Sequence, residues 1–98
     1  MAEKLKYVRG SGNIFVDVGF PKAEAENLKL RFDVMMKIED FYCRSGMTQA
    51  TAAKALGLTQ PRFNALLKGK IQLFSLDALV NIASRAGLNV RLVIKKAA

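Results

Sequence analysis

The sequence has no histidine and only one cysteine, Cys43, among its 98 residues. Without histidine, the Ser-His-Asp and Cys-His arrangements of nucleophilic enzymes and the commonest metal ligand are excluded. One cysteine cannot form an intrachain disulfide, and without histidine it cannot complete an ordinary structural zinc site. Cys43 has apolar and aromatic neighbours, so we expect a core or interface residue. The sequence therefore predicts a protein that is not an enzyme and holds no metal and no cofactor.

Long hydrophobic runs are also missing. No apolar stretch is long enough to span a bilayer, and the first ten residues, MAEKLKYVRG, have no apolar centre of the kind a secretion signal needs. An unpaired cysteine fits a reducing compartment. We therefore expect a cytoplasmic protein without membrane contact. The length and the 51% apolar content suit one domain with one core.

Acidic residues are scarce in the second half of the chain. Residues 1–47 hold eight basic and seven acidic residues, whereas residues 48–98 hold eight basic residues and only Asp77 as an acid. Such asymmetry suggests contact with a polyanion, nucleic acid or membrane. Charge alone is equally compatible with a role in solubility.

The N-terminal third contains one long predicted helix. Residues 1–12 end in Gly-Ser-Gly and are interpreted as a mobile arm. Residues 13–20 alternate as a strand does, although an irregular packed segment fits equally well. A helix should begin at Pro21, which suits the first helical turn, run to about Arg44 and stop at Gly46.

This helix has an apolar arc of roughly 200°, wider than the ~100° of an ordinary core-facing helix. One apolar stripe consists of Leu30, Val34, Ile38 and Phe41, and an adjoining stripe of Leu28, Phe32, Met35 and Tyr42. Either the helix is clamped between its own core and the N-terminal segment of its own chain, or the second stripe buries against another chain. The pattern does not decide between these alternatives.

Residues 48–69, TQATAAKALGLTQPRFNALLKG, indicate two short helices joined by a tight turn. Thr48 is a good N-cap for a first helix over residues 49–56. Gly57 can adopt the left-handed conformation that ends a helix sharply. This is the arrangement that places a second helix in the major groove of DNA.

The second short helix is capped by Thr59 or Gln60, has Pro61 in its first turn and ends at Gly69. Its spacing predicts an inner face of Phe63, Leu66 and Leu67. The outer face should consist of Pro61, Asn64, Ala65 and Lys68, with Gln60 and Arg62 at its edges.

These residues resemble the helix-turn-helix of the phage repressor and Cro (XRE) family. The motif positions that match are Thr48, Gln49, Ala53, Gly57, Gln60, Leu66 and Gly69. The resemblance extends upstream to Ile38, Phe41 and Met47, and downstream to Ser75, Leu76, Leu79 and Ile82. The flanks GSGNIFVDVGFPKAEAEN and NVRLVIKK are similar to those of small HigA-like antitoxin regulators.

The resemblance implies roles for individual residues. Gln60, Arg62 and Asn64 would reach DNA bases, since Gln and Asn can pair with adenine and Arg with guanine in the major groove. The phosphate contacts would come from Thr48, Gln49, Thr59, Lys68 and Lys70. Pro61 departs from the family pattern, because it biases Gln60 toward extended backbone. The sequence therefore leaves two alternatives for Gln60, which either reads a base or only caps the helix.

The C-terminal part should contain one more helix and a strand. Ser75 is a good N-cap for a helix over residues 76–86, which Gly87 ends, and Phe74 and Leu79 form a hydrophobic staple.

The tail alternates between apolar and other side chains over residues 89–96. Its predicted strand face consists of Val90, Leu92 and Ile94. A lone strand needs a partner, either residues 14–18 or the same strand of a second protomer, and the second is favoured because helix-turn-helix dimers need a fixed spacing.

Together these patterns predict a mainly α-helical, repressor-like domain of four to five helices, with a helix-turn-helix and a short C-terminal β-strand paired across a dimer. We divide the chain into an N-terminal arm (1–20), a DNA-binding domain (21–87) and a C-terminal strand and tail (88–98). The resemblance implies a homodimeric, nucleoid-associated repressor that binds double-stranded DNA at a palindromic operator. It also implies that this repressor autoregulates a toxin–antitoxin operon and binds a small protein toxin. The alternatives are a module that mainly neutralises a toxin, or a phage-type repressor without one.

Overall fold

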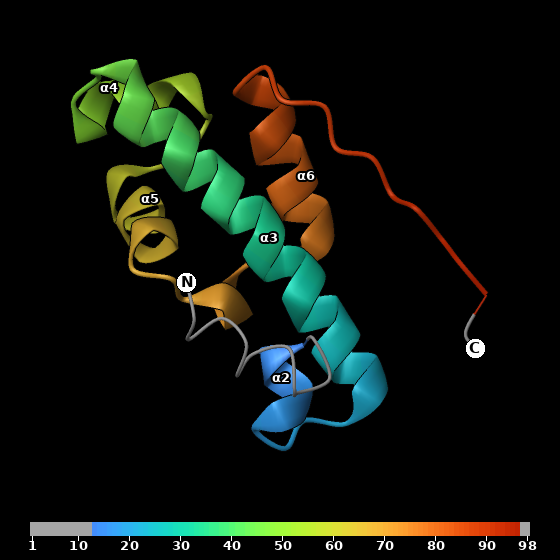
Figure 1. Cartoon of the computed structure of the whole chain (residues 1–98). Helices are drawn as coiled ribbons and strands as arrows, with labels where there is room; N and C mark the ends of the chain where they lie inside the picture. The colour runs from blue at the N-terminus through green and yellow to red at the C-terminus, as the bar shows by residue number, and fades with distance from the viewer. Residues whose placement is uncertain (1–12, 97–98) are drawn as a thin grey trace, which may run out of the picture.

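The computed structural model describes residues 13–96, which form five α-helices and one short 3-10 helix. In chain order these are α2 (Ile14–Asp17), α3 (Lys22–Ser45), α4 (Gln49–Ala55), α5 (Gln60–Leu67), η1 (Ile71–Leu73) and α6 (Leu76–Arg85). The long helix α3 crosses the molecule diagonally, with α4 and α5 on one side, α6 on the other and α2 at its N-terminal end (Figure 1). The predicted mainly helical, repressor-like class is therefore confirmed.

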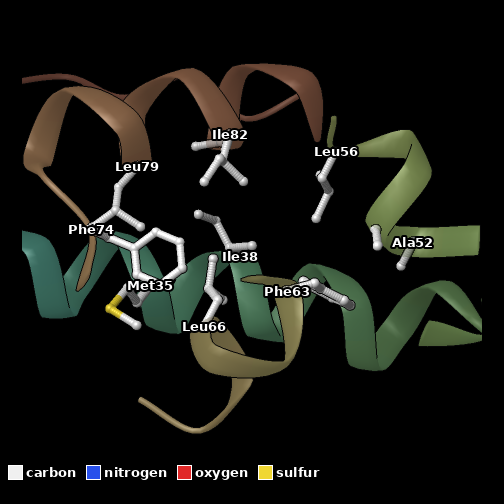
Figure 2. Close-up of a cluster of buried hydrophobic side chains, with 11 residues drawn as sticks. Met35, Ile38, Ala52, Leu56, Phe63, Leu66, Phe74, Leu79 and Ile82 are labelled. Atoms are coloured by element: carbon white, nitrogen blue, oxygen red, sulfur yellow. The ribbon is translucent and has the colours of Figure 1, made fainter. Parts of the chain in front are cut away.

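One apolar core lies where α3, α4, α5 and α6 meet (Figure 2). Its largest side chains are Phe63 and Phe74, both almost completely buried. The small residues Ala52 and Ala53 of α4 are buried as well, so this helix can approach its neighbours closely. The remaining buried members of the cluster are Met35, Ile38, Leu56, Leu66, Leu79, Ile82 and Ala83. The core thus fixes both short helices of the predicted motif against α3.

The predicted helix ends are mostly confirmed. Helix α3 starts directly after Pro21 and ends at Gly46, whose φ of 74° is the left-handed conformation that glycine adopts readily. The hydroxyl oxygen of Ser75 accepts a hydrogen bond from the N–H of Ala78 and caps α6, as predicted. Phe74 and Leu79, the predicted staple residues, are both buried at this helix start.

The segment over residues 13–20 is neither the strand nor the irregular piece that its alternation suggested. Residues Ile14–Asp17 form helix α2. The side chain of Asn13 caps this helix by accepting a hydrogen bond from the N–H of Phe15 at 2.8 Å, and it donates to the carbonyl oxygen of Ala25 in α3 at 3.0 Å. The ring of Phe15 meets Phe32 of α3 edge-on, with ring centroids 6.2 Å apart. These contacts, which the spacing of apolar residues does not reveal, favour a helix here.

The wide apolar arc of α3 is largely used within the chain. Leu28 and Met35 of the second stripe are buried, and Tyr42 packs edge-on against Phe63 with centroids 5.1 Å apart. Phe32 remains 42% exposed even though α2 covers part of it. The alternative in which the stripe packs within its own chain is therefore correct for most of its length.

Cys43 does not lie in the core. Its side chain is exposed on α3. The core alternative is therefore wrong, because consecutive helical residues point in different directions around the helix, and the interface alternative stays a prediction.

The C-terminal tail does not form a strand within the described residues. After Leu88, the backbone continues to residue 96 without regular structure, and within the described part of the chain residues 89–96 make no hydrogen bond. The tail extends away from the body beside α6, on the side of α3 opposite α5 (Figure 1). Pairing with residues 14–18 is excluded, because that segment is helical. Within residues 13–96 the predicted strand therefore has no partner.

The predicted mobile arm over residues 1–12 lies outside the described residues, as do residues 97–98. Of the helices in the described range, none has the length and apolar character needed to cross a membrane.

Candidate nucleic-acid interface

Two short helices, α4 and α5, are joined by the tight turn that the sequence predicted. The hydroxyl oxygen of Thr48 accepts a hydrogen bond from the N–H of Thr51 at 3.2 Å and so caps α4. Gly57 follows the helix with φ 74°. The next N–H, that of Leu58, donates back to the carbonyl oxygen of Ala53 at 2.8 Å and closes the turn.

The start of α5 settles which residue caps it. The hydroxyl oxygen of Thr59 accepts a hydrogen bond from the N–H of Arg62 at 3.3 Å. Gln60 is therefore the first helical residue and Pro61 the second. Both side chains are exposed. Pro61 is accommodated because a proline in the first turn loses no intrahelical hydrogen bond.

The inner face of α5 follows the predicted spacing, whereas the predicted outer face is wrong at Ala65. Phe63 and Leu66 are buried, and Leu67 is half-buried. On the outer side, Asn64 is half-buried, and Ala65 packs partly against the core. The most exposed side chains of α5 are thus Gln60, Pro61 and Arg62 in its first turn. The N-terminal end of α5 is therefore the part of this helix that is most accessible to DNA.

Arg62 is exposed, yet its position is defined. Its guanidinium carbon lies 4.3 Å from the centroid of the Phe74 ring. One guanidinium nitrogen, Nη1, donates a hydrogen bond to the carbonyl oxygen of Leu73 at 3.4 Å. The side chain therefore points from α5 toward the segment that follows η1.

The residues predicted to contact phosphates fall into two groups. The hydroxyls of Thr48 and Thr59 serve as helix caps, and Gln49 is half-buried at the start of α4. Lys68 directly follows α5 and Lys70 directly precedes η1, and both are exposed. The two lysines lie at opposite ends of the short turn that contains Gly69.

The charge around α4 and α5 is entirely positive. Residues 41–76 contain no aspartate or glutamate, but they contain Arg44, Lys54, Arg62, Lys68 and Lys70. The two ion pairs found between described residues, Lys29–Asp33 and Arg44–Asp40, both lie within α3. No carboxylate in the described part of the chain therefore pairs with the basic side chains of α4, α5 and the turn after it. Such a surface attracts phosphate groups.

A family model described as a helix-turn-helix domain matches residues 14–95. The chain belongs to this helix-turn-helix family. A solved structure named as an XRE family transcriptional regulator is 28% identical to the chain, with a TM-score of 0.70. That match covers 76% of this chain and 83% of the other. No curated protein matches the chain.

The match to the helix-turn-helix family includes both ends of the described chain. Helix α2 and most of the C-terminal tail lie inside residues 14–95, so they belong to the family's domain and are not additions to it. The XRE regulator supports the same architecture, as its similarity extends over three quarters of this chain.

Sequence reasoning missed one residue that shapes this helix-turn-helix surface. Arg31 of α3 is half-buried, and its Nη1 donates to the carbonyl oxygens of Ile71 at 3.3 Å and Phe74 at 3.1 Å. These contacts fix the segment after α5 to α3. An arginine on a long helix looks solvated in the sequence, so only the fold reveals this role.

The helix-turn-helix domain offers no cluster of metal ligands among its described residues. No group of three or more histidine, cysteine, aspartate or glutamate side chains comes together in residues 13–96. Its exposed polar groups around α5 include amides and cations, the kinds of group that pair with base edges in the major groove.

Proposed function

We propose that the protein is a transcriptional repressor that binds a specific DNA sequence through helix α5. The observation that carries this proposal is the first turn of α5, where Gln60 and Arg62 are exposed on a surface without carboxylates. Family membership and the similarity to an XRE family transcriptional regulator support it. The function is occupancy of the major groove, with no covalent step.

In this proposal, different residues supply specificity and affinity. Gln60, Arg62 and Asn64 contact base edges, because side-chain amides and guanidinium groups match the acceptor and donor patterns of adenine and guanine. Lys68 and Lys70 neutralise phosphates beside the exit of α5. Thr48, Gln49 and Thr59 donate further hydrogen bonds to the backbone of DNA.

We further propose that the repressor is a homodimer held together by its C-terminal tails. Val90, Leu92, Val93 and Ile94 are between 40% and 86% exposed. Their backbone groups have no partner in the described chain, and the same segment from a second copy could pair with them in antiparallel order around a two-fold axis. Two copies would then present two α5 helices to a palindromic operator.

The experiment that tests the DNA-binding role is selection of bound duplexes from a random library by the purified chain. We expect enrichment of one palindromic sequence, with half-sites about one helical turn apart. The double variant Gln60→Ala/Asn64→Ala should lose this selection but keep weak, sequence-independent binding. If the wild-type chain enriches no sequence, the proposal is wrong.

An exposed apolar surface favours a second role, that of the antitoxin of a toxin–antitoxin operon. Where α2 packs against α3, Ile14, Val18 and Phe32 leave 61%, 65% and 42% of their surfaces exposed. Exposed apolar groups of this kind occur at protein–protein contacts. Co-expression with the product of the neighbouring gene tests this role. We expect a stable complex that Arg62→Ala/Asn64→Ala preserves and Ile14→Glu/Val18→Glu breaks.

A further inference from the structure

Arg62 of α5 is held by two contacts with a segment that lies eleven and twelve residues further along the chain. The face of its guanidinium lies over the Phe74 ring, and Nη1 donates to the carbonyl oxygen of Leu73. No carboxylate among the described residues pairs with it, so an ion pair does not account for its position. An exposed arginine would otherwise sample many rotamers.

The ring beneath this arginine belongs to the buried core. Phe74 is 1% exposed and packs in the core with Met35 and Leu79 (Figure 2). On its inner side, the Phe74 carbonyl oxygen accepts a hydrogen bond from Arg31. The loop is thus fixed by one arginine from α3 and contacted by a second from α5. Phe74 cannot move without disturbing the core.

An arginine that stacks on an aromatic ring keeps the N–H donors of its guanidinium available for hydrogen bonds. The five N–H donors of a guanidinium lie in its plane, and among residues 13–96 one carbonyl oxygen, that of Leu73, accepts from one of them. A planar fork of donors fits two neighbouring acceptors, either O6 and N7 of guanine or two oxygens of a phosphate. A side chain that is already ordered loses less entropy when it binds.

We propose that Phe74 is a positioning residue, which holds Arg62 as an ordered two-pronged donor for guanine or phosphate acceptors of DNA. The proposal rests on the DNA-binding role proposed above. It assigns to a buried core residue an influence on DNA binding that is separate from its contribution to stability.

A double-mutant cycle tests this coupling. Arg62→Met keeps the aliphatic stem but removes the donors, and Phe74→Met keeps a similar volume but removes the aromatic face. We expect Arg62→Met to weaken binding to the selected operator about tenfold. Phe74→Met should weaken it about threefold, the size of an exposed cation–π contact. The double variant should bind as weakly as Arg62→Met alone, because Phe74 acts only through Arg62.

Phe63→Met is the matched control. Phe63 is also fully buried, but its ring packs against Tyr42 and no arginine. In this background Arg62→Met should keep its full tenfold effect. Circular dichroism and thermal unfolding show whether each variant is folded. Arg62→Lys needs no change in the core, and it should bind almost as weakly as Arg62→Met, since a lysine has no planar fork.

The outcomes separate this inference from the proposed function. Additive effects of Arg62→Met and Phe74→Met, or wild-type affinity of Arg62→Lys, overturn the positioning role. Failure of the wild-type chain to select any duplex overturns DNA binding itself. Where coupling is found, loss of preference at one guanine identifies a base contact. An equal loss on all sequences, with a salt slope smaller by about one, identifies a phosphate contact.

Discussion

The hydroxyl oxygen of Thr59 accepts a hydrogen bond from the backbone N–H of Arg62 at 3.3 Å. This contact places Thr59 before α5 and makes Gln60 its first helical residue. The side chain of Gln60 is then exposed at the tip of the helix. The sequence left open whether Gln60 caps the helix, and the structure assigns the cap to its neighbour.

Removing this cap should destabilise the domain. Thr59→Ala leaves the N–H of Arg62 without its acceptor, and we expect the free energy of unfolding to fall by about 1 kcal/mol. Urea denaturation followed by circular dichroism measures the loss. Thr59→Ser keeps the hydroxyl and should retain most of the stability. Equal losses in both variants would show that the hydroxyl does not act as a cap.

The structure also predicts that Arg31 matters for stability. Arg31→Met removes the donor to the carbonyl oxygens of Ile71 and Phe74 while keeping an apolar side chain of similar length. We expect a loss of about 1–3 kcal/mol, because the two carbonyl groups lose a charged donor. Thermal unfolding measures it. Lys29→Met, on the same helix but in an exposed ion pair, should cost no more than about 0.5 kcal/mol. A comparable loss in both variants would contradict a special role for Arg31.

The positive φ of Gly57 gives a prediction about backbone strain. Gly57→Ala places a methyl group 2.8 Å from Nε of Arg85, whereas Gly46→Ala meets nothing within 4 Å at the same φ of 74°. Because the end of the exposed Arg85 side chain can move aside, we expect both variants to lose about 1 kcal/mol from backbone strain alone. Chemical denaturation compares them. A much larger loss for Gly57→Ala, relieved by Arg85→Ala, would show that Arg85 is fixed over the turn.

The sequence predicts the features of this fold that depend on residues close together in the chain. It does not predict the features that depend on contacts between distant segments. The caps Thr48 and Ser75 and the glycine at position 57 act through groups a few residues away, so their effects could be predicted from spacing alone. Helix α2 could not be predicted in this way. It depends on the hydrogen bond from Asn13 to Ala25 and on the packing of Phe15, which join distant segments.

The same distinction applies to the candidate site. The exposure of Gln60 and Arg62 follows from helical period, and the sequence predicts it. The stacking of Arg62 on Phe74 connects residues on either side of η1, and no periodicity relates them. The tail shows a third case. Its alternation indicates a strand, but a strand requires a partner, and residues 13–96 of the same chain offer none.

Phosphate contact by the exit turn predicts a uniform effect on DNA affinity. Lys68→Ala should weaken binding to every duplex alike and reduce the slope of log affinity against log salt by about one, since one fewer counterion is released. Fluorescence anisotropy across a salt series measures this slope. Lys22→Ala, at the far end of α3 (Figure 1), is the control and should leave the slope unchanged. A changed base preference in Lys68→Ala, at constant slope, would contradict the phosphate role.

Dimerisation through the tails predicts that a substitution in the tail weakens both self-association and DNA binding without lowering the stability of the monomer. Ile94 is 86% exposed in the single chain, so Ile94→Lys should change the stability of a monomer by less than about 0.5 kcal/mol. In a paired dimer, Ile94→Lys places like charges near the interface and should shift the chain toward monomer in analytical ultracentrifugation. Because two linked half-sites bind DNA far more tightly than one, operator affinity should fall by at least about a hundredfold. Lys95→Ala, the neighbouring position, removes charge and should not weaken the dimer. A wild-type chain that sediments as a monomer at micromolar concentration, or Ile94→Lys that remains dimeric, would show that the tails do not join the protomers.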